Sequence, residues 1–311
     1  MTTVRVAAVD CGTNSIRLLV ADVDVETRLL VDVVRRMEIV RLGQGVDRTG
    51  RLDGAALART FDAVDRYAAT IAALGAEHVR FAATSATRDA ANRDDFVWGV
   101  RERLRVEPEV LSGSEEAALS FTGALSALAP GAHPQPYLVV DIGGGSTEFV
   151  LGDPEHGATA SHSVDIGCVR LTERHFREDP PSPAEVSAAR DDIDAAIVEA
   201  QRRVPLRQAQ TLIGLAGSVT TVSALALGLE VYDAARIHGS VIRAASVHRV
   251  CEELLYMSRE RRASLPVMHP GRVDVIMAGA LIWSTVVAHT GVAEVVASEH
   301  DILDGLALSL V

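Results

Sequence analysis

Residues 137–151 read YLVVDIGGGSTEFVL, and residues 6–20 read VAAVDCGTNSIRLLV. In each stretch an apolar run ends in an aspartate, a turn of small and polar residues follows, and a second apolar run begins. At a constant shift along the chain, Asp10 aligns with Asp141 and Ser15 with Ser146. A repeat that opens two halves of one chain predicts two domains of like fold that face each other. The predicted fold class is therefore α/β, with two similar domains.

A segment rich in Pro and Gly separates the two halves. Residues 129–136, APGAHPQP, come just before the second copy of the repeat and predict a linker. The N-terminal domain then spans residues 1–128 and the C-terminal domain residues 137–311. The last helix, at about residues 300–311, is expected to pack back on the first domain. Its apolar side chains are equally suited to a homodimer contact, and both alternatives stay open.

The composition bounds the class of protein. The chain has 311 residues, 48% of them apolar, which is enough for two globular cores. Charged residues or Pro interrupt every apolar run, so no membrane span is predicted, and the first residues do not resemble a secretion signal. Three cysteines that lie far apart indicate reduced thiols in a cytoplasmic protein. A net charge of −12 argues against nucleic acid as a partner, although a local basic rim could still hold a phosphate substrate.

The two aspartate turns are candidate anion and metal sites. Successive backbone N–H groups in a small-residue turn form a concave anion-binding nest, and Asp10 or Asp141 at the strand end could hold Mg²⁺ beside the anion. A dinucleotide fingerprint would require a helix after the glycines, whereas residues 148–151 continue as a strand. A plain structural hairpin is the remaining alternative, and it is weakened because the turn occurs twice.

Two further turns resemble phosphate-binding sites. Residues 212–221, LIGLAGSVTT, predict a strand, a glycine turn and a helix whose first N–H groups favour anions. Ordinary capping by Ser218 or Thr220 is the alternative reading. Residues 81–93 repeat the pattern, and Arg88 in a first helical turn suggests a nearby anion. The alternative for Arg88 is a surface ion pair with Asp89 or Asp94.

A pair of glutamates opens another predicted helix. Ser112 and Glu115 have the spacing of a capping box, which gives Glu115 a structural role. Glu116 is not needed for that box, and it is a candidate to orient or deprotonate an attacking water. The histidines form no zinc-binding pattern.

Taken together, these segments resemble the exopolyphosphatase and guanosine pentaphosphate phosphohydrolase family. The motifs at residues 9–15, 83–88, 112–117, 141–148, 165–170, 214–221 and 298–305 carry the resemblance and fall in order along the chain. The resemblance implies the actin-like ATPase fold, with two ribonuclease-H-like domains and an active site in the cleft between them. It implies that Glu116 orients the attacking water, and that Asp141 and Glu148 hold Mg²⁺ (or Mn²⁺), with Asp10 as a further candidate ligand. The phosphate contacts it implies are Asn14, Ser15, Arg88, Gly143, Gly144, Gly145, Ser146, Gly217, Ser218 and Thr220.

The predicted function is Mg²⁺-dependent removal of the terminal orthophosphate from inorganic polyphosphate. The alternative substrate is guanosine pentaphosphate, because both activities share these motifs. A sensor that binds either compound without turnover is a third possibility, which the joint presence of Glu116, Asp141 and Glu148 disfavours. A sugar or acetate kinase on the same fold is a fourth. Long relatives carry further C-terminal helical domains that grip long polyphosphate, so short chains are the expected substrate.

Overall fold

The computed structural model describes residues 2–129 and 131–311, and the chain forms two compact units. The first unit contains residues 2–126 together with the C-terminal segment 302–311, and the second lies between them and ends at Asp301. The first unit therefore ends slightly before the predicted boundary at residue 128. Residues 302–311, which the sequence prediction numbered with the C-terminal domain but expected to pack back on the first domain, form part of the first unit. Of the predicted linker, Pro130 lies outside the described residues.

A five-stranded sheet forms the centre of the first unit. Its strand order is β3-β2-β1-β4-β5, with β2 antiparallel to β1 and β3, and with β1, β4 and β5 parallel. The apolar runs identified in the sequence form these strands, because alternate residues can then be buried on both faces of the sheet. The strands are β1 (Thr3–Cys11), β2 (Ser15–Asp24), β3 (Leu30–Ile39), β4 (His78–Ala83) and β5 (Glu109–Val110).

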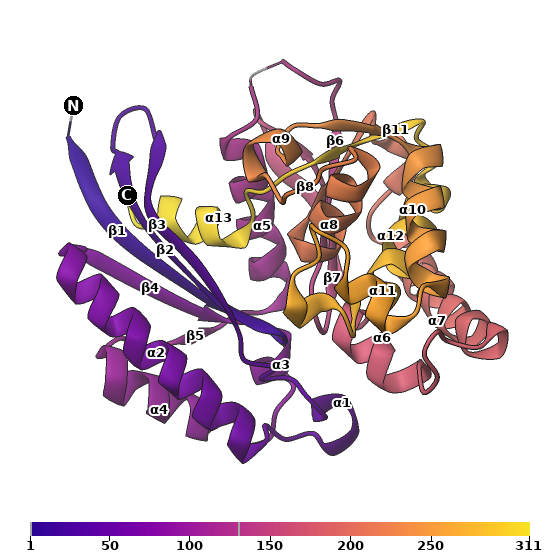
Figure 1. Ribbon diagram of the computed structural model, residues 1–311. Coiled ribbons are helices and arrows are strands. Elements are labelled where there is room, and N and C mark those ends of the chain that lie inside the picture. Colours follow the sequence, from indigo (N-terminus) through magenta and orange to yellow (C-terminus); the bar gives the residue numbers. More distant parts are fainter. Residues whose placement is uncertain (1, 130) are drawn as a thin grey trace. The chain divides into compact units, whose positions relative to one another are not determined.

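Helices cover both faces of this sheet (Figure 1). One face packs on α2 and α4, where Tyr67 and Phe96 are buried. The other face packs on α13 and α5, and Leu303 and Leu306 of the C-terminal helix join Ala8 in its core. The helices of this unit are α1 (Val46–Thr49), α2 (Gly54–Leu74), α3 (Ser85–Arg88), α4 (Arg93–Leu104), α5 (Gly113–Ser126) and α13 (Ile302–Leu308).

The second unit repeats this topology around a six-stranded sheet. Its order is β10-β11-β9-β6-β7-β8, so that, starting from β8, the first five strands correspond to those of the first unit and β10 is added at the far edge. The strands are β6 (Tyr137–Ile142), β7 (Thr147–Asp153), β8 (Gly157–Val164), β9 (Thr211–Leu215), β10 (Val241–Arg243) and β11 (Glu294–Ala297).

The helices of the second unit enclose one large apolar core. Trp283 of α12 is fully buried there, together with Phe149 of the sheet. The helices are α6 (Cys168–His175), α7 (Pro183–Gln201), α8 (Ala216–Ala226), α9 (Ala234–Ile237), α10 (Ala244–Tyr256), α11 (Arg259–Ala263) and α12 (Ile276–Thr290), with 3₁₀ turns η1 (Leu206–Gln208) and η2 (Pro270–Arg272).

The predicted fold class is confirmed: each unit is an α/β domain with ribonuclease-H-like strand order. Side chains cap two of the helices. Asp53 caps α2, and Ser182 and Glu185 form the capping box of α7. Among residues 2–129 and 131–311, no helix combines the length and apolarity that a membrane crossing requires.

Candidate active site

In the first unit, three predicted motifs follow neighbouring parallel strands. The turn after β1, the turn that contains α3 after β4, and the start of α5 after β5 lie at the same edge of the sheet. Backbone hydrogen bonds join these segments, from the Thr84 amide to the Cys11 carbonyl (3.2 Å) and from the Leu111 amide to the Ala83 carbonyl (2.9 Å). In open α/β sheets, ligands bind outside the carboxyl ends of the strands, which is where this edge lies.

The turn after β1 is held in shape by its own backbone. The Gly12 amide donates to the Ser15 carbonyl at 2.9 Å, and the Asn14 carbonyl accepts from the amides of Val40 and Arg41. The Thr13 hydroxyl is hydrogen-bonded to the Ser85 hydroxyl at 2.9 Å, which ties this turn to α3. The turn is therefore fixed before any ligand arrives, as an anion site requires if binding is not to cost ordering entropy.

Arg88 and Glu116 form an ion pair in the first unit. Arg88 Nη1 donates to Glu116 Oε2 at 3.1 Å and to the Leu111 carbonyl at 2.9 Å. The partner is neither Asp89 nor Asp94, so the surface ion pair considered from the sequence is wrong. The helix-dipole argument also fails, because α3 is a single turn that Arg88 ends rather than begins.

Glu115 and Glu116 differ in their surroundings although they are adjacent. The Glu115 carboxylate accepts from the Ser112 amide at 2.9 Å and from the Ser112 hydroxyl at 2.7 Å, so it closes the predicted capping box. These hydrogen bonds lower the pKa of Glu115. Glu116 is buried, with 8% of its surface exposed, and it contacts Arg88. The Glu115 carboxylate therefore serves to cap α5, whereas the Glu116 carboxylate lies beside the guanidinium of Arg88 at the sheet edge.

In the second unit, the turn after β6 reproduces the turn after β1. The Gly143 amide donates to the Ser146 carbonyl at 3.0 Å, the counterpart of the bond from Gly12 to Ser15. The start of α6 occupies the remaining carbonyls: Gly144 accepts from the amides of Val169 and Arg170, and Gly145 accepts from Arg170 Nε at 2.7 Å.

The backbone amides of the same turn, unlike its carbonyls, can donate to a ligand. Within residues 2–129 and 131–311, the amides of Gly144, Gly145 and Ser146 donate to no other protein group. Gly167 allows the close approach of α6, because a Cβ there would lie 2.4 Å from the Gly144 carbonyl oxygen. A rigid turn whose carbonyls are bound and whose consecutive amides are not is a backbone anion nest.

Asp141 and Glu148 are placed directly opposite each other on β6 and β7. Directly opposed residues of an antiparallel pair have side chains on the same face with their Cβ atoms about 4.5–5.5 Å apart. Both carboxylates are buried, at 7% and 1% exposure, and the Ser163 hydroxyl donates to Glu148 Oε1 at 2.7 Å. Two buried carboxylates at this spacing repel each other, so the pair favours a bound cation.

The corresponding pair in the first unit carries opposite charges. Asp10 and Arg17 are opposed on β1 and β2 in the same register, and Arg17 Nη2 donates to Asp10 Oδ2 at 2.6 Å. Arg17 Nε reaches the same oxygen at 2.9 Å. The repeat thus contains an Asp–Arg ion pair in the first unit and an Asp–Glu pair in the second. Neutralisation by Arg17 makes Asp10 a poorer metal ligand than Asp141 or Glu148.

The third anion candidate is the start of α8, next to the Gly143–Ser146 turn. β6 and β9 are parallel neighbours with Asp141 paired to Leu215, so the two segments lie at one edge of the second sheet. In the part of the chain that the structure describes, no side chain caps α8, and the first amides of this helix have no acceptor within it. Ala216 at this start has a φ of +65°, a conformation that non-glycine residues rarely adopt.

The hydroxyls of this turn are directed into the protein. The Ser218 hydroxyl packs against Gly279, where a Cβ would lie 2.0 Å from it. The Tyr232 hydroxyl is hydrogen-bonded to the Thr220 hydroxyl at 2.7 Å and to Glu299 Oε1 at 2.6 Å. A phenol has one proton and an ionised carboxylate can only accept, so Tyr232 donates to Glu299 and Thr220 donates to Tyr232. The backbone amides, rather than these hydroxyls, are the donors that α8 offers to an anion.

Sequence reasoning missed Arg272. Its guanidinium lies over Gly217, where a Cβ would be 2.3 Å from Arg272 Cζ, and its Nη1 donates to the Thr221 hydroxyl at 3.2 Å. It therefore adds positive charge at the start of α8. No spacing in the sequence pointed to Arg272, because it lies more than 50 residues from the turn that it covers; the one available signal was a glycine at position 217.

The cysteine nearest this site is not reactive, and the candidate metal ligands are carboxylates. Burial raises the pKa of the Cys168 thiol to about 11, so this thiol remains protonated at neutral pH and is a poor nucleophile. In the described part of the chain, no group of three or more His, Cys, Asp or Glu residues is placed to hold a metal ion. Asp141 and Glu148 offer two hard oxygen donors, which matches Mg²⁺, an ion usually held by one or two carboxylates with water or substrate phosphates as its other ligands.

Comparison with known proteins identifies the family of the chain. Exopolyphosphatase 2 of Mycobacterium tuberculosis (strain ATCC 25618 / H37Rv) is 50% identical over 321 residues, covering 100% of this chain and 99% of that protein. A guanosine-5'-triphosphate,3'-diphosphate pyrophosphatase of Photobacterium profundum is 31% identical over 71% of this chain and 43% of its own length. The crystal structure of an exopolyphosphatase-like protein has 43% identity and a TM-score of 0.96, covering 100% of this chain and 98% of its own. The Ppx/GppA phosphatase family matches residues 19–311, and the chain belongs to that family.

Proposed function

We propose that the chain is an exopolyphosphatase, a hydrolase that releases terminal orthophosphate from inorganic polyphosphate. The observation that carries the proposal is the second-unit turn. Its three consecutive amides, which have no acceptor among the described residues, adjoin the opposed carboxylates of Asp141 and Glu148. Amides suit phosphate oxygens, and a carboxylate pair suits a cation that neutralises phosphate charge. The similarity to exopolyphosphatase 2 along the whole chain supports this substrate.

The amides would hold the phosphoryl group that is transferred. The Gly143–Ser146 turn and the start of α8 supply N–H donors, and Arg272 supplies positive charge. Hydrogen bonds from these donors would offset the negative charge on the oxygens of the transferred phosphoryl group, and such electrostatic stabilisation is usually the largest contribution to phosphoryl transfer. Because α6 already occupies the turn carbonyls, the donors need little rearrangement during the reaction.

Asp141 and Glu148 would hold Mg²⁺ or Mn²⁺, which when bound neutralises charge on the phosphate oxygens. Their buried, directly opposed carboxylates are the structural reason for this assignment. Ser163 donates to Glu148 and so fixes the orientation of one carboxylate. Asp10 is a weaker candidate, since Arg17 occupies one of its oxygens.

Glu116 would orient the attacking water and accept its proton. Arg88 binds both Glu116 and the Leu111 carbonyl, so it orients this carboxylate as well as adding positive charge for the substrate. We propose that Asn14, Ser15 and Arg88 of the first unit contact phosphate groups of the substrate. General-base assistance of this kind typically contributes about 10²–10⁴ in rate.

Guanosine pentaphosphate is the second candidate substrate. The similarity to the Photobacterium profundum pyrophosphatase supports it, although that similarity is lower and covers less of either chain. Both substrates present a terminal phosphate to the same donors, so the chemistry is shared and the recognition of the rest of the molecule differs.

One experiment distinguishes the two substrates. Phosphate release is measured from polyphosphates of graded length, from guanosine pentaphosphate and from ATP, each with Mg²⁺. The proposal expects the highest kcat/KM with a polyphosphate. A higher kcat/KM with guanosine pentaphosphate would favour the second candidate, and release from none of them would reject a phosphohydrolase.

A further inference from the structure

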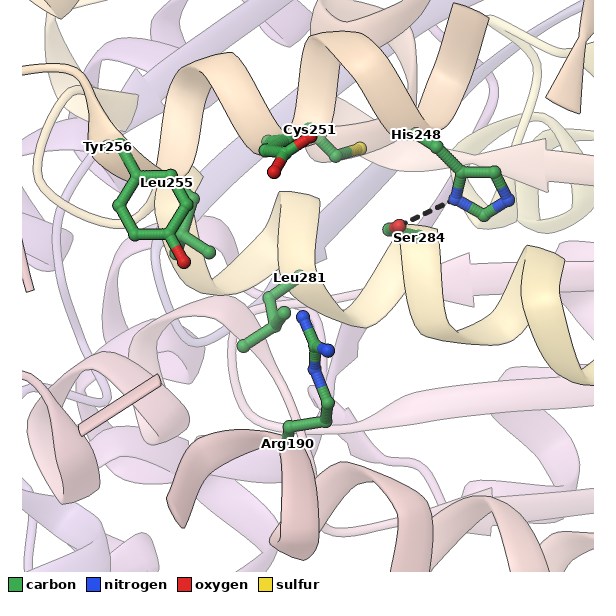
Figure 2. Close-up of a pocket in the computed structure, with 8 residues that line it drawn as sticks. Arg190, His248, Cys251, Leu255, Tyr256, Leu281 and Ser284 are labelled. Carbon is green, nitrogen blue, oxygen red and sulfur yellow. Dashed lines mark hydrogen bonds between the residues drawn. The ribbon is translucent and has the colours of Figure 1, made fainter. Parts of the chain in front are cut away.

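The second unit has a cavity that the phosphohydrolase chemistry does not use. It has a volume of about 220 Å³ and lies between α7, α10 and α12. Leu255, Leu281 and Cys251 form an apolar floor and are nearly fully buried, and the half-exposed ring of Tyr256 forms one wall. Figure 2 shows these side chains around the space, with Arg190 reaching toward it from the other side.

Two opposite charges line this cavity without pairing. Within the described residues, Arg190 of α7 and Glu252 of α10 make no ion pair or hydrogen bond, with each other or with any other side chain. Other exposed charges on α10 behave differently: Arg249 Nη1 donates to Glu253 Oε1 at 2.8 Å. The unpaired charges of Arg190 and Glu252 are therefore available to a ligand.

The remaining polar groups close one end of the cavity. His248 Nδ1 is hydrogen-bonded to the Ser284 hydroxyl at 2.8 Å, as the dashed line in Figure 2 shows. This bond joins α10 to α12 and leaves the other ring nitrogen of His248 for a ligand or water. The cavity thus combines an apolar floor with a few fixed polar groups, the usual composition of a small-molecule site.

We propose that this cavity binds a small zwitterion with an apolar body, of the class of a free aliphatic amino acid. A carboxylate on the ligand would pair with Arg190 in the bidentate geometry that guanidinium favours, and an ammonium group would pair with Glu252. A simple anion would instead bring its charge close to Glu252. The volume is below the roughly 300–1,000 Å³ of drug-sized pockets, so a ligand the size of leucine matches it.

The cavity is connected to the phosphate-binding turn through α12. Leu281 and Ser284 line the cavity, and Gly279 of the same helix packs directly against Ser218 at the start of α8. A ligand that holds α12 acts on the backbone that presents the α8 amides. This consequence rests on the proposed function and predicts a changed KM for polyphosphate at saturating leucine. An unchanged KM would remove the link but not the binding site.

The binding test uses the full chain and isothermal titration calorimetry. L-leucine, 4-methylpentanoate, which lacks the ammonium group, and 3-methylbutylamine, which lacks the carboxylate, are titrated in turn. We expect leucine to bind and each single-charge analogue to bind at least about tenfold more weakly, because each analogue lacks one charge-assisted pair and a tenfold change corresponds to about 1.4 kcal/mol. No leucine binding up to about 10 mM, or 4-methylpentanoate binding as tightly as leucine, overturns the proposal.

Paired variants locate the site. Arg190→Gln and Glu252→Gln should each weaken leucine binding at least about tenfold. Arg249→Gln and Glu253→Gln change residues of α10, the helix of Glu252, that do not line the cavity. These two variants should leave leucine binding unchanged. Thermal midpoints of all four variants establish that they fold, and basal phosphate release should match that of the unaltered chain. Unchanged leucine affinity in both cavity variants would show that this cavity is not the binding site.

Discussion

Two adjacent glutamates test the assignment of the water-orienting group. Glu116→Gln keeps the size of the side chain and can still accept from Arg88, so the fold should be retained. Because an amide cannot accept a proton from water, kcat should fall by about 10²–10⁴ with KM little changed. Steady-state kinetics of phosphate release measures both values.

Glu115→Gln is the matched control. Glu115 closes the capping box with Ser112, and Gln can occupy the same position in such a box. Its activity should remain close to that of the unaltered chain. Loss of turnover at Glu115 alone would mean that the wrong carboxylate has been assigned, and full activity in both variants would reject the mechanism.

The opposed carboxylates predict opposite effects on stability and activity. Asp141→Asn removes the repulsion between Asp141 and Glu148, so the metal-free protein should become more stable by about 0.2–1 kcal/mol. The same change removes a ligand, so activity should be lost. Mg²⁺ should raise the thermal midpoint of the unaltered chain, since a ligand that binds only the folded state stabilises it, and should have little effect on the variant. An equal Mg²⁺ response in both proteins would exclude Asp141 as a ligand.

Ala216 predicts that the turn before α8 stores strain. Its φ of +65° costs a non-glycine residue about 1–2 kcal/mol. Ala216→Gly should relieve part of that strain, although glycine also loses more chain entropy on folding, so a gain of about 0.5–1 kcal/mol is expected. Urea unfolding measures the change. Ala224→Gly, two residues before the end of the same helix, is the control and should be destabilising. A loss of stability at both positions would contradict the assignment of strain.

At the scale of secondary-structure elements, apolar periodicity and capping signals predicted most of the framework. The strand predicted within residues 212–221 is β9, and the capping box predicted for Ser112 and Glu115 forms at the start of α5. These signals are local, so one sequence contains them. The partner of Arg88 and the position of Arg272 over Gly217 were not predictable, because both depend on how distant segments of the chain pack.

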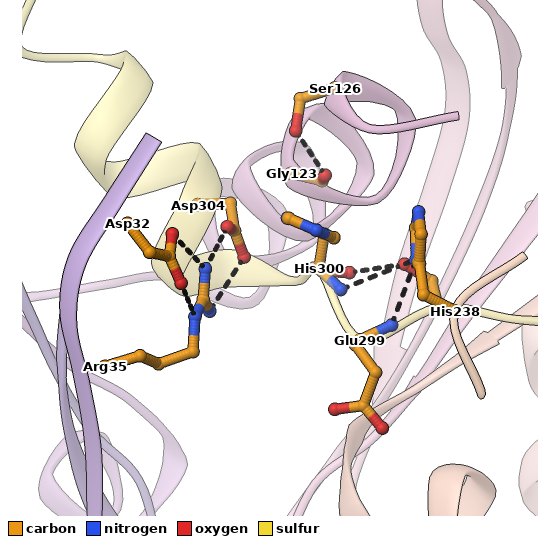
Figure 3. A network of polar contacts seen from close by, with 9 residues as sticks. Asp32, Arg35, Gly123, Ser126, His238, Glu299, His300 and Asp304 are labelled. Carbon is orange, nitrogen blue, oxygen red and sulfur yellow. Dashed lines mark hydrogen bonds and ion pairs between the residues drawn. The ribbon is translucent and has the colours of Figure 1, made fainter. Parts of the chain in front are cut away.

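Helix α13 illustrates such a long-range contact. Arg35 of β3 forms an ion pair with the buried Asp304, and its pKa is raised, mainly by the nearby Asp304 charge and against the effect of burial (Figure 3). Arg35 also pairs with Asp32 at 2.7 Å. At the next residue of the helix, Gly305 contacts α5 so closely that a Cβ would lie 2.1 Å from the Leu119 carbonyl oxygen. Both the sheet and α5 therefore hold this helix.

Gly305→Ala should consequently force α13 away from α5. The contact is with backbone, which cannot rotate aside, so a loss of about 1–3 kcal/mol is expected from overpacking. Gly54→Ala is the control, because a Cβ there meets nothing within 4 Å. Chemical denaturation compares the two variants. Equal stabilities would show that the crossing of α13 and α5 is looser than the structure indicates.

For the molecule as a whole, the two units predict unequal dependence on the C-terminal segment. The second unit is continuous in sequence, ends at Asp301 and has its own core around Trp283. The first unit needs residues 302–311, because Leu303, Leu306 and Leu308 cover one face of its sheet and are almost fully buried. Removing them exposes apolar surface on Ala8 and Leu19, and each lost leucine contact costs about 2–5 kcal/mol.

Two fragments test this unequal dependence. A chain of residues 1–301 should retain a folded second unit and lose the cooperative unfolding of the first, whereas residues 127–301 alone should fold, since the core of that unit is complete. Differential scanning calorimetry and amide hydrogen exchange can assign each transition to a unit, because separate domains need not unfold in one step. Protection of β1 and β2 in the 1–301 chain equal to that in the full chain would show that α13 is not needed for the first core. An unfolded 127–301 fragment would show that the second unit is not an independent folding unit.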